Sequence, residues 1–207
     1  MIGNMARTDR RPRHRLDPDS RRTAILDAAT GIFATHPYSQ VTLSSIAEAA
    51  EGSTPLVYRY FDGKEGLYAE VVRQAIDSLL SAQTRALEAL PDGVPTRDRI
   101  RTATLVYLDH IARRPGAWAT PLRQPGGEPA SAAALRERAR ADDVERLAAL
   151  LEPSDRPRHR YAMWGYLGFV DAACLRWVEH GCPPEERWEL IDAALGALEG
   201  ALGDWAA

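Results

Sequence analysis

The chain has 207 residues, of which 45% are hydrophobic and 27% are charged, and its formal net charge is −3. This is ordinary globular composition, so collagen-like, low-complexity and wholly disordered classes are excluded. The length suits one large or two small domains with a real core. The net charge excludes no function by itself, because a whole-chain sum hides how the charge is distributed.

The charge is in fact distributed unevenly along the chain. Residues 1–22 carry seven arginines against three aspartates, whereas residues 65–207 carry 17 cationic residues against 22 acidic ones. The basic end is therefore N-terminal, and this polarity favours contact between that end and a polyanion such as DNA.

Cysteine content and hydropathy bear on the compartment and the cofactors. Cys174 and Cys182 are the only cysteines, too few for a disulfide framework, which favours a reducing compartment. No run of about 18 apolar residues is present, so we expect a cytoplasmic protein with no membrane span. Cys174, His180 and Cys182 match no metal-ligand spacing. We therefore expect neither a metal nor a cofactor.

The first 19 residues lack periodicity and are mostly polar, which predicts a disordered basic arm over residues 1–19. Its arginines are suited to a minor groove or to phosphates. A solubilising tail or an early start codon is the alternative explanation. These arginines are Arg7, Arg10, Arg11, Arg13 and Arg15.

Beyond the arm, apolar spacing predicts helices almost throughout, with proline and glycine between them and no alternating strand. The expected helices cover about 20–35, 43–50, 54–60, 64–90, 96–113, 130–151, 158–180 and 184–203. Pro115-Gly116 closes the helix at 96–113, and a loop-rich stretch around 124–127 follows. The helix at 64–90 is about 40 Å long at 1.5 Å per residue, which is enough to bridge two domains.

Residues 41–67 hold the most informative pattern, two short amphipathic helices joined by a tight turn. Such helices cannot form a core alone and must pack on the helix at 20–35. Glu51-Gly52 supplies the turn, and Ser53 is placed to cap the next helix. Val57 and Phe61 face inward at i and i+4, which leaves the intervening side chains outward.

The outward side chains of the second short helix are Thr54, Tyr58, Arg59 and Tyr60. An exposed Tyr-Arg-Tyr suits a helix in a major groove, where arginine and tyrosine reach base edges and phosphates. The alternative is a solvated face with some aromatic packing. The pattern therefore predicts a helix-turn-helix whose second helix reads DNA.

Lys64, the only lysine, falls in the first turn of the long helix, where the helix dipole disfavours a cation. A DNA phosphate at the same helix N-terminus would reverse that effect. Asp62 and Glu65 are spaced as an N-cap and N3 pair and predict a capping box.

Together these residues resemble the DNA-binding region of TetR-family transcriptional regulators over about residues 20–68. The resemblance rests on Thr42-Leu43-x-x-Ile46-Ala47-x-x-Ala50, Ser53, Val57-Tyr58-Arg59-Tyr60-Phe61 and Lys64-Glu65-x-Leu67. It implies DNA contacts from eight residues. They are Thr42, Ser53, Thr54, Pro55, Tyr58, Arg59, Tyr60 and Lys64.

The turn departs from the family pattern, which usually has glycine and then an apolar residue before Ser53. Here Glu51 precedes Gly52. Either the turn shifts by one residue or Glu51 adopts a left-handed conformation that costs about 1–2 kcal/mol.

Aromatic and polar side chains of the C-terminal part are candidates for a ligand pocket, although aromatic residues at helical spacing are often simply core. The candidates are Tyr107, His110, Trp118, Arg123, Tyr161, Trp164, Phe169 and Trp177, and Tyr166 and Arg176 share the pattern. A second stripe in the last helix indicates either a dimer interface, which we favour, or an intrachain core. It comprises Trp188, Ile191, Leu195, Leu198 and Leu202.

The sequence thus predicts an all-α protein with a helix-turn-helix domain at 20–66 and a ligand-binding and dimerisation domain at 67–207. By resemblance it is a homodimeric repressor that a small molecule, partly apolar or aromatic, releases from double-stranded operator DNA. Two reading helices would enter major grooves about 34 Å apart. The alternatives are an activator or a regulator without a small-molecule ligand, and beyond these a helical interaction module or a small enzyme.

Overall fold

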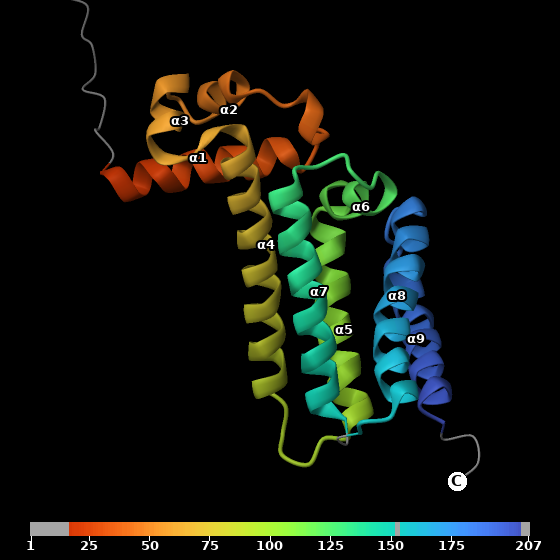
Figure 1. Cartoon of the computed structure of the whole chain (residues 1–207). Helices are drawn as coiled ribbons and strands as arrows, with labels where there is room; N and C mark the ends of the chain where they lie inside the picture. Colours follow the sequence, from red (N-terminus) through yellow and green to blue (C-terminus); the bar gives the residue numbers. More distant parts are fainter. Residues whose placement is uncertain (1–16, 152–153, 204–207) are drawn as a thin grey trace, which may run out of the picture.

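The computed structural model describes residues 17–151 and 154–203, and the described chain is helical with no strand (Figure 1). This agrees with the all-α expectation. The N-terminal elements are α1 (Pro18–Phe33), the 3₁₀ turn η1 (Tyr38–Gln40), α2 (Leu43–Ala49), α3 (Thr54–Tyr60) and α4 (Gly63–Glu88). The remaining elements are α5 (Thr96–Arg113), α6 (Pro115–Arg123), α7 (Ala130–Leu150), α8 (Pro157–Glu179), η2 (Pro184–Glu186) and α9 (Arg187–Leu202).

Helix α1 begins two residues earlier than the sequence pattern predicts. Asp17 caps it by accepting hydrogen bonds from the backbone N–H groups of Asp19 and Ser20, at 3.1 and 3.0 Å. Pro18 takes the first helical position, where a missing N–H costs nothing. Residues 17–19, which the sequence analysis assigns to the arm, therefore belong to the cap and the first turn of α1. The rest of the predicted arm, residues 1–16, lies outside the described residues.

Helices α1, α2 and α3 form one hydrophobic core with the first turns of α4. Ile25, Ile46, Val57 and Leu67 are at most 1% exposed at its centre. The core reaches along α4 as far as Val72 and also takes in Ala132 from the start of α7. The three short helices are thus held on the end of a much longer one.

Helix α4 continues away from this domain beside α5 and α7, as the sequence predicts for a bridging helix (Figure 1). Helices α5 and α7–α9 build a second core, and α8 and α9 pack side by side at one edge of the molecule (Figure 1). No helix in the described part of the chain is long and apolar enough to cross a membrane.

Helix α6 is absent from the sequence prediction, in which Pro115-Gly116 ends a helix and begins a loop. Pro115 does end α5, but it also occupies the first turn of α6, where proline is tolerated. The backbone passes close to α1 here, since a Cβ placed on Gly116 would lie 3.4 Å from the carbonyl oxygen of Ala34.

Candidate DNA-binding and effector sites

The first helix of the candidate DNA-binding site is fixed by a capping box. The Thr42 hydroxyl accepts a hydrogen bond from the Ser45 N–H at 3.1 Å, and the Ser45 hydroxyl accepts one from the Thr42 N–H at 3.4 Å. Thr42 is exposed, so the same side chain starts α2 and faces solvent.

The turn between α2 and α3 contains Glu51 in the left-handed region, at φ 51°. Of the two possibilities that the sequence leaves open, the strained glutamate is the one observed. The turn closes through the Gly52 N–H, which donates to the Ala47 carbonyl at 2.8 Å. A Cβ on Gly52 would lie 3.3 Å from the Leu56 side chain, so Gly52 provides close packing of the turn against α3.

Helix α3 buries Val57 and presents the opposite face to solvent. Tyr58 is 62% exposed, and Arg59 is exposed beside it. Tyr60 is half-buried against the N-terminal core, so it is less available than the sequence predicts. Ser53 occupies the N-cap position as expected, but its side chain makes no capping hydrogen bond. Ser53 and Pro55 are exposed and Thr54 is half-buried.

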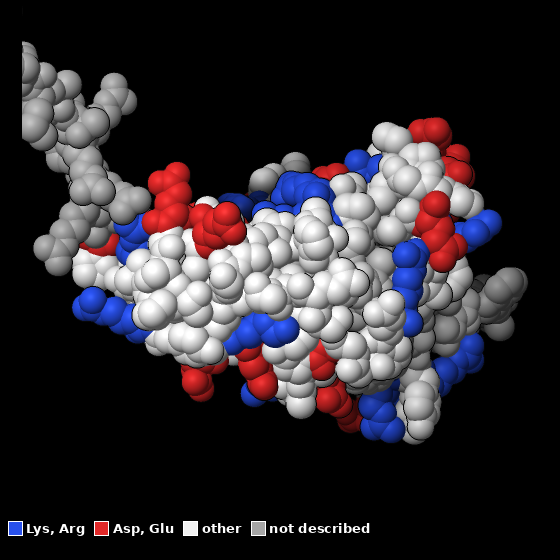
Figure 2. Space-filling model, turned by 90° about the horizontal axis from the view of Figure 1, so that it is seen from above, with Lys and Arg blue, Asp and Glu red and all other residues white. Residues whose placement is uncertain are grey.

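Most cations of the described N-terminal domain are occupied within the protein. Arg21 donates to the Ala50 carbonyl, and Arg22 forms an ion pair with Glu70 at 2.8 Å. Arg59 makes no hydrogen bond or ion pair with any described residue, which leaves its guanidinium free for a ligand. Figure 2 looks onto this end of the molecule and shows basic and acidic side chains in small separate groups around a largely uncharged surface.

Lys64 has an internal role that the sequence does not reveal. Its Nζ donates to the carbonyl oxygens of Tyr38 and Val41, each at 3.0 Å, and lies 4.1 Å from the centre of the Tyr38 ring. Lys64 therefore fastens the segment between α1 and α2 onto α4. The predicted capping box is absent: the Asp62 side chain makes no cap, and Glu65 accepts instead from Ser131 of α7 at 2.8 Å.

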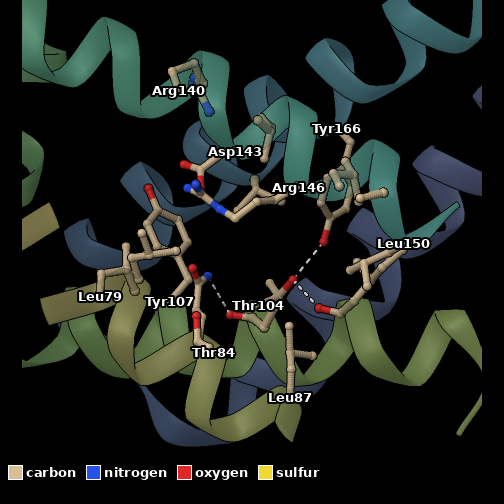
Figure 3. Close-up of a pocket in the computed structure, with 18 of the residues that line it drawn as sticks. Leu79, Thr84, Leu87, Thr104, Tyr107, Arg140, Asp143, Arg146, Leu150 and Tyr166 are labelled. Carbon is tan, nitrogen blue, oxygen red and sulfur yellow. Dashed lines mark hydrogen bonds and ion pairs between the residues drawn. The ribbon is translucent and has the colours of Figure 1, made fainter. Parts of the chain in front are cut away.

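The largest change from the sequence prediction concerns the ligand pocket. A cavity of about 290 Å³, here called the effector cavity, lies between α4, α5, α7 and α8 (Figure 3). Its lining is mainly apolar, with a smaller set of polar groups, as in many small-molecule sites. The apolar residues include Leu79, Leu80, Leu87, Leu147, Leu150 and Val170, and the polar ones include Thr104, Tyr107, Arg140, Asp143, Arg146 and Asp171.

Hydrogen bonds connect the polar wall of the effector cavity to α6. Trp118 Nε1 donates to the Tyr107 hydroxyl at 2.8 Å, and that hydroxyl donates to Asp171 at 2.9 Å. Arg140 forms an ion pair with the other oxygen of Asp171. Burial raises the pKa of Tyr107 well above its usual value, and burial also raises the pKa of Asp171 against the lowering effect of Arg140.

The predicted pocket residues fall into two groups. Tyr107 lines the effector cavity, and His110 and Trp118 line an adjoining cavity of about 180 Å³. The others lie away from both. Arg123 forms a surface ion pair with Glu179, and Trp177 is 2% exposed in the core, where its Nε1 donates to the Pro183 carbonyl.

Three predicted pocket aromatics lie on the outer face of α8, because this helix turns a different stripe toward the cavity. Tyr161, Trp164 and Phe169 are 70%, 44% and 38% exposed. The cavity-facing stripe consists of Tyr166, Leu167, Val170 and Asp171. Sequence reasoning missed the leucines of α4 and the arginines of α7, since neither set stands out from ordinary amphipathic helix composition.

The predicted dimer stripe of α9 points mostly into its own chain. Ile191, Leu195 and Leu198 are at most 2% exposed and pack in the C-terminal core, and Leu202 is half-buried beside them. This corrects the preferred interpretation, because the intrachain alternative holds for these four residues. Trp188 is 54% exposed, so it lies outside this core.

The geometry defines a helix-turn-helix protein whose reading domain is joined by one long helix to a helical domain with an internal cavity. Residues 25–71 match the family described as bacterial regulatory proteins, tetR family. This match covers most of α1, the helix-turn-helix and the start of α4.

The curated relatives share the N-terminal part of the chain. The chain is 34% identical to the HTH-type transcriptional activator FasR of Mycolicibacterium smegmatis, over 47% of this chain and 43% of the relative. It is 29% identical to the HTH-type transcriptional repressor KstR2 of Rhodococcus jostii, over 43% of this chain and 44% of the relative. The matches thus span less than half the length of these relatives.

Solved structures share the fold over most of the chain. A tetR-family transcriptional regulator from Streptomyces coelicolor has a TM-score of 0.78 at 21% identity, covering 91% of this chain and 83% of that one. The regulator FadR from Bacillus subtilis, solved in complex with stearoyl-CoA, has a TM-score of 0.66 at 17% identity, covering 87% and 97%.

Proposed function

We propose that the protein is a homodimeric transcriptional regulator that binds operator DNA through α3 and leaves it when a small molecule occupies the effector cavity. The observation that carries the proposal is the exposed face of α3. This face presents Tyr58 and Arg59 to solvent. Arg59 has no ion-pair partner among the described residues. The domain that carries both residues matches the tetR family over residues 25–71. A protein that binds operator DNA would act in the cytoplasm. The proposed function includes no catalytic step.

The contact residues have distinct proposed roles. Arg59 reaches base edges or phosphates, and Tyr58 packs on the backbone or on bases beside it. Thr42, Ser53 and Pro55 are exposed at the start of the two helices and supply backbone contacts. Thr54 and Tyr60 are half-buried, so they shape the reading surface more than they extend from it.

The outer face of α8 and α9 supports a homodimer. Helix α8 exposes Tyr161, Trp164 and Phe169, and α9 exposes Trp188. A groove of about 500 Å³ between the two helices is lined by Tyr161, Gly165, Phe169 and Ala197. A Cβ added to Gly165, Gly168 or Gly196 would meet nothing within 4 Å, so another backbone can approach closely. A second copy that buries this face would pair two reading helices for a palindromic site.

Helix α4 is shared by the effector cavity and the DNA-binding domain, which supports release of DNA by an effector. Helix α4 lines the effector cavity with Leu79, Leu80 and Leu87, and its first turns belong to the core of the DNA-binding domain. A ligand that favours a different tilt of α4 changes the separation of two reading helices in a dimer. The FadR structure with stearoyl-CoA shows that a protein of this fold binds a small molecule.

Fluorescence anisotropy with the DNA upstream of the protein's own gene tests DNA binding. Arg59→Gln and Tyr58→Ala should each weaken specific binding about tenfold or more, since a good base contact contributes about 1–3 kcal/mol. Arg138→Gln removes an exposed charge from α7 and serves as the matched control, with binding unchanged. Specific binding that survives the Tyr58 and Arg59 changes together would refute the proposed reading surface.

Sedimentation analysis tests the dimer. Phe169→Glu places a charge in the aromatic outer face and should give monomers that bind the operator weakly. Ala133→Glu adds the same charge at an exposed position of α7 and should leave the dimer intact. A Phe169→Glu protein that remains dimeric would show that another surface pairs the subunits.

A further inference from the structure

Three adjoining cavities follow the inner side of α4 from its C-terminal end to the DNA-binding domain. The effector cavity and the cavity of about 180 Å³, here called the middle cavity, share Leu79, Leu80 and Tyr107. The middle cavity shares Ala75, His110, Trp118 and Arg136 with a third cavity of about 330 Å³. From Leu87 to Ala75 the helix rises roughly 18 Å, so the row of cavities suits an elongated ligand.

The far end of this row is apolar. Two of its hydroxyl groups satisfy each other, since Thr104 and Tyr166 form a buried hydrogen bond at 2.8 Å and Thr104 also donates to the Ile100 carbonyl. The Thr84 hydroxyl lines the same end. A charged ligand group placed here would lose its water without gaining an ion-pair partner. Most of the remaining lining at this end is hydrocarbon and includes Leu87, Leu147, Leu150, Leu167 and Val170.

The charged groups between the effector and middle cavities neutralise one another. Arg140 forms an ion pair with Asp171, and Arg146 forms one with Asp143. Because each arginine already forms an ion pair with a carboxylate, this junction favours neither an anionic nor a cationic group of a ligand. It can accept an uncharged polar group in the middle of a ligand.

The third cavity, here called the interdomain cleft, has a different electrostatic character. Its walls come from α1, from α4, and from the end of α5 with the start of α6. Arg113 and Arg114 line it and form no ion pair with any described residue, whereas Arg136 is paired with Glu128 at 3.2 Å. Asp27 on α1 is the acidic side chain among the lining residues, so the cations are in excess.

We propose that the effector is a single-chain amphiphile with an anionic head, with its tail in the effector cavity and its head in the interdomain cleft against Arg113 and Arg114. This inference rests on the proposed function. The order of the cavities carries it, because an apolar end, a neutral junction and a cationic cleft match the order of groups along such a molecule. The head lies between walls that belong to both domains, which gives the ligand a direct means of favouring one arrangement over another.

Isothermal titration calorimetry on the full chain without DNA tests the head group. The probes are dodecanoate, dodecyl phosphate and the uncharged dodecanol, each below its critical micelle concentration. Dodecanoate or dodecyl phosphate should bind at least tenfold more tightly than dodecanol, since hydrogen bonds to charged groups contribute about 1.5–3 kcal/mol. The two anions separate a carboxylate effector from a phosphate ester. Equal binding of the anion and the alcohol, or no binding of either anion, overturns the proposal.

Two variants test where the ends of the molecule lie. Arg113→Gln with Arg114→Gln should reduce anion binding to the level of the alcohol. Arg85→Gln with Arg138→Gln, the charge-matched control outside all three cavities, should leave it unchanged. Leu87→Trp fills the apolar end and should weaken dodecanoate much more than hexanoate. Anion binding that is insensitive to the paired arginine changes, or a Leu87→Trp effect that is equal for both chain lengths, contradicts the placement.

The ligand-binding experiments and the DNA-binding experiments can fail independently of each other. A protein that binds its operator but none of the anionic amphiphiles retains the proposed function and loses only this inference. A protein that binds the anions but no specific DNA loses the regulator proposal while the ligand site stands.

Discussion

Replacing Lys64 by methionine separates a structural lysine from a DNA contact. Methionine keeps the stem of the side chain and removes the charge, so the two carbonyl oxygens of Tyr38 and Val41 lose their donor. Each hydrogen bond from a charged donor contributes about 1.5–3 kcal/mol, and the contact with the Tyr38 ring adds about 0.5–1 kcal/mol. Lys64 is half-buried and water replaces part of this, so the expected loss of stability is about 2 kcal/mol.

Urea denaturation followed by circular dichroism gives the stability, and DNA binding measured against salt concentration gives the number of phosphates that the protein neutralises. Removing a cation that neutralises one phosphate lowers the salt slope by about 0.9. Lys64→Met should leave the slope unchanged, and Arg59→Gln should lower it if Arg59 meets a phosphate. Unchanged stability together with a lower slope for Lys64→Met would refute the structural role and restore Lys64 as a phosphate contact.

Backbone geometry, titration and burial each give a further prediction. Glu51→Gly should stabilise the protein by about 1 kcal/mol in urea denaturation by relieving the left-handed glutamate, whereas Glu51→Ala should not; equal effects would contradict this. Burial, together with the three arginines of the interdomain cleft, lowers the pKa of His110 below 6.5. Unfolding therefore takes up a proton, stability should fall as the pH drops below about 6.5, and His110→Gln should remove that part of the pH dependence. Burial raises the pKa of the Cys174 thiol far more than that of Cys182, so limited alkylation followed by mass spectrometry should find Cys182 modified first.

The DNA-binding domain is predictable from sequence because its signals are local. The spacing of Ile46, Val57 and Phe61 defines which faces of two short helices are buried, and a three-helix unit leaves few ways to bury them. For the turn, the sequence leaves two possibilities, a shift by one residue or a left-handed Glu51, and the structure decides for Glu51. The role of Lys64 is hidden, because its carbonyl partners lie 23 and 26 residues earlier in the chain.

The cavity and the outer face are not predictable because they depend on how amphipathic helices rotate when they pack together. Helix α8 carries aromatic residues on more than one side, and only packing decides that Tyr166 faces inward while Tyr161 and Phe169 face outward. Aromatic content is therefore a poor guide to the effector cavity, whose walls come largely from leucines of α4. The stripe of α9 is apolar as predicted, but the same spacing serves an intrachain core and a dimer interface equally.

Two helices, α4 and α7, connect the effector cavity to the DNA-binding domain, whereas the sequence predicts a connection through α4 alone. Ala132, at the start of α7, is fully buried in the N-terminal core, and Ser131 beside it donates to Glu65 of α4. Farther along α7, Asp143 and Arg146 line the effector cavity, roughly 16 and 21 Å from Ala132 along the helix. Because a close-packed core transmits displacement, a ligand that shifts α7 moves a residue already embedded among α1 and α4. Tilting of α4 alone would have to break these contacts, so the two helices must move together.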